Sequence, residues 1–221
     1  MPELAFSSHA VFKRRRLEDD AADPARISSE VEEVFSKASD NVQVRGIYST
    51  AGFTAHADVM FWFTSGSSDR IQDLLVDLRR TALGRSLEPV DTFLGVVQAA
   101  EFAKDHQPAF VKGAEPKKYM TVYPFVRTPE WYLLEPQERG RLLREHGEAG
   151  REFPDILANT TSAFGLGDFE WVLCFEADGP ERIVELIRRL RATEARRFTK
   201  VEIPFYTGIR KELSAVVQDL R

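Results

Sequence analysis

The chain has 221 residues, a formal net charge of −5 at pH 7 and 43% hydrophobic residues. This balance is typical of a soluble globular protein and argues against disorder. No apolar run approaches the roughly 20 residues that a membrane-spanning helix needs, and the negative charge offers no electrostatic footprint for nucleic acid. We therefore expect neither a membrane span nor a nucleic-acid partner.

The basic run KRRR (13–16) is followed directly by LEDD (17–20), so we interpret it as a solvated loop. The residues after the arginines lack the apolar stretch that an export signal requires. Cys174 is the single cysteine of the chain, which excludes an intrachain disulfide or a cysteine metal cluster. These features predict a cytoplasmic protein.

Hydrophobic periodicity predicts the main elements in chain order. They are a helix over 28–39, a strand over 55–63, a helix over 71–85, strands over 90–97 and 119–126, a helix over 135–153, a strand over 166–176, a helix over 183–197 and a strand over 201–209.

Two stretches of the chain repeat one pattern. AHADVMFWF (55–63), a polar break and IQDLLVDLRRTALGR (71–85) correspond to LGDFEWVLCFE (166–176), a break and IVELIRRLRATEARR (183–197). Both helices are amphipathic and can cover a sheet. We predict an α+β fold of two tandem ferredoxin-like units, with halves 1–110 and 111–221. Two such sheets can pack face to face or close into a barrel, with apolar space for a ligand between sheet and helices.

His146 lies on one face of the predicted helix over 135–153, together with Leu142, Ala149 and Phe153. An inward-facing histidine is commonly a core residue with satisfied ring nitrogens. It is also a good axial ligand for haem iron, and Gly147 and Gly150 reduce side-chain bulk beside it. The residues alone leave both interpretations open.

The other three histidines give weaker indications of a function. His106 lies in the loop AKDHQPAF, where a lone histidine is commonly exposed and without a role, although near a redox centre it could act as a base toward peroxide. We assign no role to His9 and His56.

The strand YMTVYPFVRT (119–128) places Tyr123 and Arg127 on one face. At ~3.3 Å per residue they are roughly 13 Å apart, comparable with the width of a porphyrin. Pro124 cannot donate to a ladder, so we expect interrupted or edge pairing there. An ordinary half-exposed strand explains the same pattern. Trp131 and Tyr132 follow, and aromatics of this kind are most often core residues.

Taken together, several segments resemble the chlorite dismutase-like family, and most closely its actinobacterial coproheme decarboxylase branch. The strongest are HQPAF (106–110), YPFVRTPEWYLL (123–134), REHGEAGREFP (144–154), ANTTSAFGLGDFEWVLCFEAD (158–178) and VEIPFYTGIRK (201–211). The resemblance implies a dimeric α+β barrel within one chain and assembly into a homopentamer. It also implies the oxidative decarboxylation of two propionates of iron-coproporphyrin (coproheme) to vinyl groups, which gives haem b with hydrogen peroxide as oxidant.

The resemblance also implies residue roles. His146 matches the family's proximal iron ligand, and Tyr123 the tyrosine whose radical attacks the propionate. His106 matches the distal histidine that takes a proton from peroxide. Arg127 matches the residue that fixes a propionate, and Trp131 belongs to the pocket wall.

Other functions remain open from the sequence. Chlorite-decomposing members carry a distal arginine where spacing from His146 gives Asn159 here, which argues against a chlorite dismutase. A haem-binding or haem-delivery protein without decarboxylase activity needs only the ligand His146, and a structural α+β domain that oligomerises through its sheet needs none of these residues. The resemblance further suggests transient contact with the iron-inserting chelatase.

Overall fold

The computed structural model describes residues 4–15, 23–97 and 107–221. In chain order the elements are β1 (Ala5–Arg14), α1 (Pro24–Ala38), β2 (Val42–Ser49), β3 (Val59–Ser65), α2 (Ser68–Arg80), α3 (Ala82–Arg85), β4 (Leu87–Val97), β5 (Tyr119–Arg127), α4 (Pro129–Leu133), α5 (Pro136–Arg151), β6 (Leu157–Ser162), β7 (Trp171–Ala177), α6 (Pro180–Arg191), the 3₁₀ helix η2 (Glu194–Phe198), β8 (Thr199–Val201), β9 (Tyr206–Arg210) and α7 (Leu213–Asp219).

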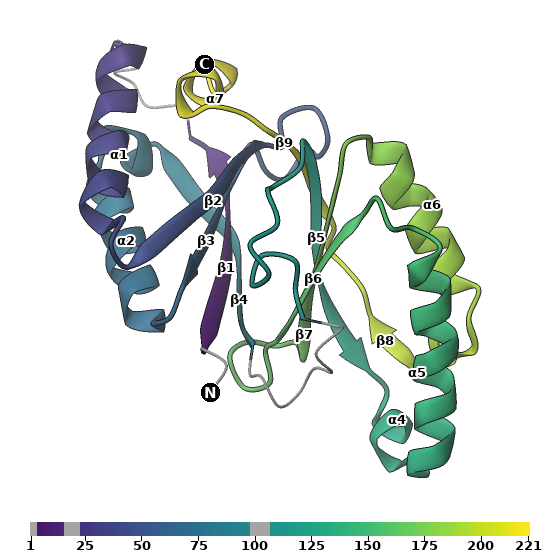
Figure 1. Cartoon of the computed structure of the whole chain (residues 1–221). Coiled ribbons are helices and arrows are strands. Elements are labelled where there is room, and N and C mark those ends of the chain that lie inside the picture. Colours follow the sequence, from purple (N-terminus) through teal and green to yellow (C-terminus); the bar gives the residue numbers. More distant parts are fainter. Residues whose placement is uncertain (1–3, 16–22, 98–106) are drawn as a thin grey trace.

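The strands form a closed antiparallel barrel. Their order is β7-β6-β4-β1-β3-β2-β9-β5-β8, and an additional pairing of β7 with β5 closes the ring, leaving the short β8 outside it. Each half has the ferredoxin-like order, β4-β1-β3-β2 and β9-β5-β7-β6, and the halves join through β2–β9 and β4–β6. Figure 1 shows α1 and α2 outside one half and α5 and α6 outside the other. The predicted α+β fold of two ferredoxin-like repeats is confirmed.

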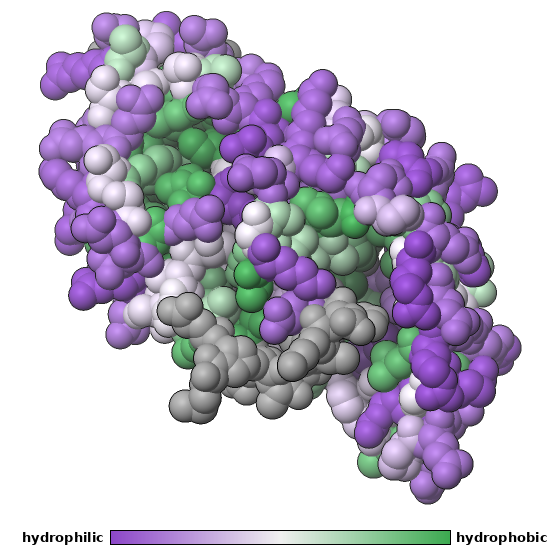
Figure 2. All heavy atoms as spheres, viewed as in Figure 1, coloured by the Kyte–Doolittle hydropathy of each residue, from purple (hydrophilic) through white to green (hydrophobic). Residues whose placement is uncertain are grey.

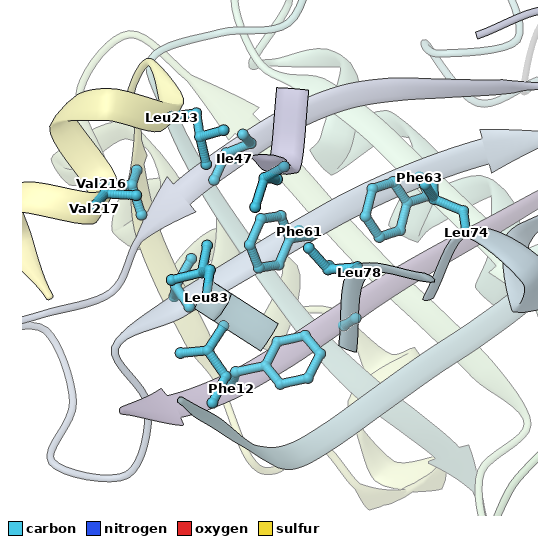
Figure 3. Packing of buried hydrophobic residues seen from close by; sticks show 14 of the residues in the cluster. Phe12, Ile47, Phe61, Phe63, Leu74, Leu78, Leu83, Leu213, Val216 and Val217 are labelled. Carbon is cyan, nitrogen blue, oxygen red and sulfur yellow. The ribbon is translucent and has the colours of Figure 1, made fainter. Parts of the chain in front are cut away.

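Aromatic rings fill the space between sheet and helices in the N-terminal half. Phe61 and Phe63 stack with centroids 6.0 Å apart, and Phe12 meets Phe61 edge-on at 5.9 Å. Helix α7 brings Leu213 and Val216 into the same core, so the end of the chain packs on the N-terminal half (Figure 3). The last helix of the chain therefore covers the N-terminal half, although it follows the strands of the C-terminal half.

The barrel interior holds a buried ion pair between the halves. Arg45 of β2 donates to Glu176 of β7 at 2.7 Å, and both side chains are at most 3% exposed. Asn159 donates to the same carboxylate at 2.9 Å, and the Arg45 guanidinium lies 4.7 Å above the Trp62 ring. Arg45 Nη1 also donates to the carbonyl of Ala114 at 2.8 Å, so residues of both halves hold the guanidinium, whereas its Nε has no hydrogen-bond partner among the described residues.

The structure corrects several predicted elements. Lys13 and Arg14 belong to β1, and Lys13 pairs with Asp58 at 2.9 Å, so this part of the basic run is not a solvated loop. The sequence did not indicate β1, β2, β6 or α7. The predicted helices over 71–85 and 183–197 end early, and each continues as a short separate helix after Thr81 or Thr193. None of the described helices is long and apolar enough to cross a membrane.

Candidate functional site

The candidate site lies between the outer face of the C-terminal sheet and helices α5 and α6. Strand alternation decides which residues face it. Tyr123 and Phe125 pack with residues of α6 such as Ile183, whereas Met120 and Val122 point into the barrel. Figure 2 shows hydrophilic outer surfaces on α5 and α6, and a recess with apolar side chains between α5 and the central strands. The predicted alternation of β5 is therefore confirmed.

Pro124 lies where one edge of β5 changes partner. On one side β5 pairs with β7 without interruption, from Tyr119 to Phe125. On the other side β9 pairs only up to Val122, and β8 begins at Val126. The intervening segment 202–205 leaves the sheet and contains a cis Ile203–Pro204 bond. The predicted interruption at the proline is confirmed.

Tyr123 is enclosed by this segment. Its side chain is 3% exposed, and its ring lies 4.3 Å from that of Phe205 and 6.2 Å from that of Phe175. Burial, followed by the negative charge of Glu202, raises the pKa of Tyr123 above its usual range. The phenol therefore keeps its proton at neutral pH, so its oxidation would require loss of the proton together with an electron.

Arg127 lies flat against aromatic rings at the end of β5. Its guanidinium is 4.1 Å from the Trp131 ring centroid and 4.7 Å from that of Phe125, and it donates to the carbonyl of Ala195 at 2.9 Å. Within residues 4–15, 23–97 and 107–221, no carboxylate forms an ion pair with it. Burial lowers the pKa of Arg127 to about 10. This guanidinium is suited to bind an anionic ligand.

The surroundings of His146 fix its tautomer. The Thr193 hydroxyl donates to the carbonyl of Leu190 at 2.8 Å, so it accepts from His146 Nδ1, 3.3 Å away. With the hydrogen on Nδ1, the lone pair of Nε2 is available to a metal. Burial and then the charge of Arg127 lower the pKa of His146. The histidine is therefore neutral at pH 7, as a haem ligand must be.

Glu202 is a residue of the site that the sequence did not indicate. Its side chain is 14% exposed and accepts from Arg191 at 2.9 Å and also from Arg196. Its negative charge contributes to raising the pKa of Tyr123, and it opposes the lowering of the pKa of Arg127 and His146. Glu202 and Phe205 lie within the predicted strand over 201–209, but the structure interrupts that strand at 202–205, so strand alternation did not show where either side chain points.

The internal repeat explains why only one half has such a site. The alignment that sets Leu78 against Leu190 sets Thr81 against Thr193, and both threonines donate to that leucine carbonyl. Thr81 then caps α3 by accepting from Gly84, whereas Thr193 faces His146.

The sheet residues differ in the same way. The repeat that sets Phe61 against Leu173 also sets Ala10 against Tyr123, because Ala10 lies opposite Phe61 and Tyr123 lies opposite Leu173 in the neighbouring strand. The stacked rings of Phe61 and Phe63 occupy the N-terminal space. Within the described residues, this helix-facing space therefore combines a phenol, a guanidinium without a carboxylate partner and an oriented histidine in the C-terminal half alone.

Two sequence expectations concern other positions. His106 lies outside the described residues. Asn159 faces the barrel interior, where its amide donates to Glu176 and accepts from the N–H of Phe110, so spacing placed the wrong side chain at the site. Its neighbours Ala158 and Thr160 face the helices instead, and β6 contains no arginine.

We also considered a cleft in the N-terminal half and possible clusters of metal ligands. A cleft of about 410 Å³ opens between α1 and α2, lined by residues such as Val34, Leu74 and the charged Lys37 and Arg80. It contains no histidine, tyrosine or cysteine. Among the described residues, no three His, Cys, Asp or Glu side chains cluster as a metal site, so a metal held here would need further ligands from a macrocycle.

Comparisons with known proteins identify relatives of this chain. Residues 24–211 match the family model described as chlorite dismutase. A coproheme decarboxylase from Mycolicibacterium smegmatis is 46% identical over 219 residues, covering 98% of this chain and 93% of that protein. A coproheme decarboxylase from Thermus thermophilus is 27% identical over 175 residues, covering 74% of this chain and 70% of that protein.

A solved structure shares the fold. The structure of chlorite dismutase from Candidatus Nitrospira defluvii in complex with imidazole has a TM-score of 0.83 at 21% identity, over 98% of this chain and 94% of that chain. The fold therefore defines a dimeric α+β barrel protein, with the candidate site in its C-terminal half. The chain belongs to the chlorite dismutase family.

Proposed function

We propose that this protein is a coproheme decarboxylase, an oxidoreductase that converts two propionates of iron-coproporphyrin to vinyl groups with hydrogen peroxide as oxidant. The observation that carries the proposal is Arg127, whose guanidinium packs against Trp131 on the same face as Tyr123 and has no carboxylate partner among the described residues. The carboxylate of a propionate can supply the missing partner of this guanidinium. The 46% identity to a coproheme decarboxylase over nearly the whole chain supports this assignment.

Coproheme is both the substrate and the redox centre, and peroxide is reduced at its iron. His146 would hold the iron through Nε2, because Thr193 keeps the hydrogen on Nδ1. Arg127 would bind one propionate in its planar fork, with Trp131 as the pocket wall behind it. Haem b would be the product.

Tyr123 would supply the radical that abstracts hydrogen from a propionate. Its buried, protonated phenol cannot ionise at neutral pH, which favours loss of an electron together with the proton. For each propionate, loss of one hydrogen atom, a second electron and carbon dioxide leaves a vinyl group. The two electrons reduce one peroxide to water, so two peroxides are consumed per coproheme.

The remaining assignments rest on the resemblance of the sequence to the family. We propose His106 as the base that takes a proton from peroxide, a homopentamer as the assembly, the cytoplasm as the compartment, and transient contact with the iron-inserting chelatase as the route of supply. Chlorite as substrate is disfavoured because β6 offers no arginine to the site.

Mass analysis of the porphyrin after a peroxide titration tests the proposal. Wild-type protein with coproheme should yield a product lighter by two carboxyl groups, through a one-vinyl intermediate. Tyr123→Phe should still bind coproheme but give no product, whereas Tyr119→Phe, at the far end of β5, should react as wild type. Bleaching without decarboxylation in the wild type would instead indicate a haem-binding or haem-delivery protein, and turnover by Tyr123→Phe would refute the radical assignment.

A further inference from the structure

Three side chains form a hydrogen-bonded series where α4 meets the start of β7. The Tyr132 hydroxyl lies 2.6 Å from Glu170 Oε2, which also accepts the backbone N–H of Arg127 at 2.7 Å. The side chain of Trp171 is hydrogen-bonded to Tyr132, and since an indole N–H can only donate, the phenol oxygen accepts it. Tyr132 is 40% exposed. The series therefore runs from the sheet to the surface.

The inner end of the series lies beside Tyr123. Trp171 pairs with Phe125 across β5 and β7, and Tyr123 pairs with Leu173. Tyr123 and Trp171 are thus diagonal neighbours on the helix-facing side of the sheet, roughly 7–8 Å apart. Electrons cross such a distance between aromatic rings readily.

Of the three tryptophans, Trp171 is best placed to be oxidised. Trp62 is fully buried in the barrel interior. Trp131 carries the Arg127 guanidinium 4.1 Å above its ring, and a fixed positive charge disfavours a radical cation there.

We propose that Trp171, Tyr132 and Glu170 form a redox relay that carries an oxidising equivalent from Tyr123 to the protein surface. Its role is to discharge the site when peroxide has been consumed but no propionate is in place to react. The oxidant is the Tyr123 radical, so this role rests on the proposed function.

The proposed transfer is balanced in electrons and protons. Trp171 gives one electron to the Tyr123 radical, which regains with it the proton lost on its own oxidation. Tyr132 then reduces the oxidised indole, and its phenolic proton moves along the 2.6 Å hydrogen bond to Glu170. The product is a neutral tyrosyl radical at the surface and a protonated carboxyl group.

Glu170 is needed because Tyr132 cannot ionise beforehand. Burial and the hydrogen bond to Glu170 raise the pKa of Tyr132 above its usual range. The proton must therefore leave with the electron, toward an acceptor already in contact. Replacing Glu170 by glutamine keeps a hydrogen-bond acceptor but removes the base.

Pulse radiolysis of the ligand-free protein tests the relay without any catalytic turnover. Azide radicals oxidise tryptophan, and the indolyl absorbance should decay in a concentration-independent phase with matching growth of tyrosyl absorbance. Tyr132→Phe and Trp171→Phe should abolish this phase, and Glu170→Gln should slow it several-fold. Tyr119→Phe, half-buried at the other end of β5, should leave it unchanged. The same phase in Tyr132→Phe as in wild type would overturn the proposal.

A second measurement uses coproheme-loaded protein with excess peroxide. The exposed radical on Tyr132 should couple between molecules, giving dityrosine fluorescence and cross-linked dimers that peptide mapping assigns to Tyr132. Dimers joined at other tyrosines would overturn the relay. If radiolysis shows the transfer but coproheme is not decarboxylated, the relay is supported and the proposed function is refuted. If coproheme is decarboxylated but radiolysis shows no such phase, the proposed function is supported and the relay is refuted.

Discussion

Replacing Arg127 should separate recognition of the propionate from general binding of the porphyrin. Arg127→Met retains a side chain that can pack against Trp131 but removes the only guanidinium on this face that lacks a carboxylate partner among the described residues. A hydrogen bond to a charged group contributes about 1.5–3 kcal/mol. We therefore expect coproheme to bind roughly 10- to 150-fold more weakly. Arg127→Lys keeps the charge without the planar fork, so its loss should be smaller.

Absorbance titration of the ligand-free variants with coproheme measures this loss. A porphyrin with all propionates esterified should bind Arg127→Met and wild type equally, because the missing interaction is with a carboxylate. Arg188→Met, at an exposed arginine of α6, is the matched control and should bind as wild type. Thermal melting checks that losing the bond to Ala195 has not unfolded the protein. Affinity within about twofold of wild type, or an equal loss with the ester, would refute the assignment.

Three further predictions concern groups around the site and in the barrel. Glu176→Gln leaves Arg45 buried and uncompensated, so urea unfolding should show a loss of about 3–5 kcal/mol, and a loss below about 1 kcal/mol would contradict the buried pair. Burial, then Arg45, lowers the pKa of His9 from 6.5 to about 3. Because the unfolded chain then binds the extra proton, stability falls as the pH drops below 6.5, by about 2 kcal/mol at pH 5. His9→Phe should remove that part of the slope, and an unchanged slope would count against it. Thr193→Val removes the acceptor for His146 Nδ1 and should weaken haem affinity by about 10- to 100-fold in an absorbance titration; unaltered affinity would show that the tautomer is fixed otherwise.

The repeat could be predicted because it shows in the local spacing of apolar residues. Apolar spacing in the helices over 71–85 and 183–197, together with alternation in β5, indicated two ferredoxin-like units and placed Tyr123 and Arg127 on one face. Strand β1 was missed because AFSSHAVFKR mixes serines and a histidine into its buried positions. Those polar residues face other strands rather than water, and a single sequence does not show that.

The candidate site could be predicted only in part from the sequence, and the tertiary structure supplied the rest. The sequence identified His146 as an inward-facing helix residue, but it left open whether the ring was a core side chain or a ligand. The orientation of the ring comes from Thr193, which is distant in sequence and follows the end of α6. Similarly, Glu202 and Phe205 belong to the segment 202–205, where the predicted strand over 201–209 leaves the sheet between β8 and β9. Asn159 was misplaced because residue spacing across the turn before β6 does not fix the face on which a strand begins.

The sequence by itself indicated the two-fold repeat and most of the helices, since these follow from periodicity along the chain, and resemblance to the family marked His146, Tyr123 and Arg127 as candidate site residues. Only the tertiary structure decided that the barrel closes through β5 and β7, and that the N-terminal space is filled by Phe61 and Phe63. Contacts between residues far apart in the chain determine both results. Such contacts also hold the Arg127 guanidinium against the Ala195 carbonyl and orient the His146 imidazole toward Thr193.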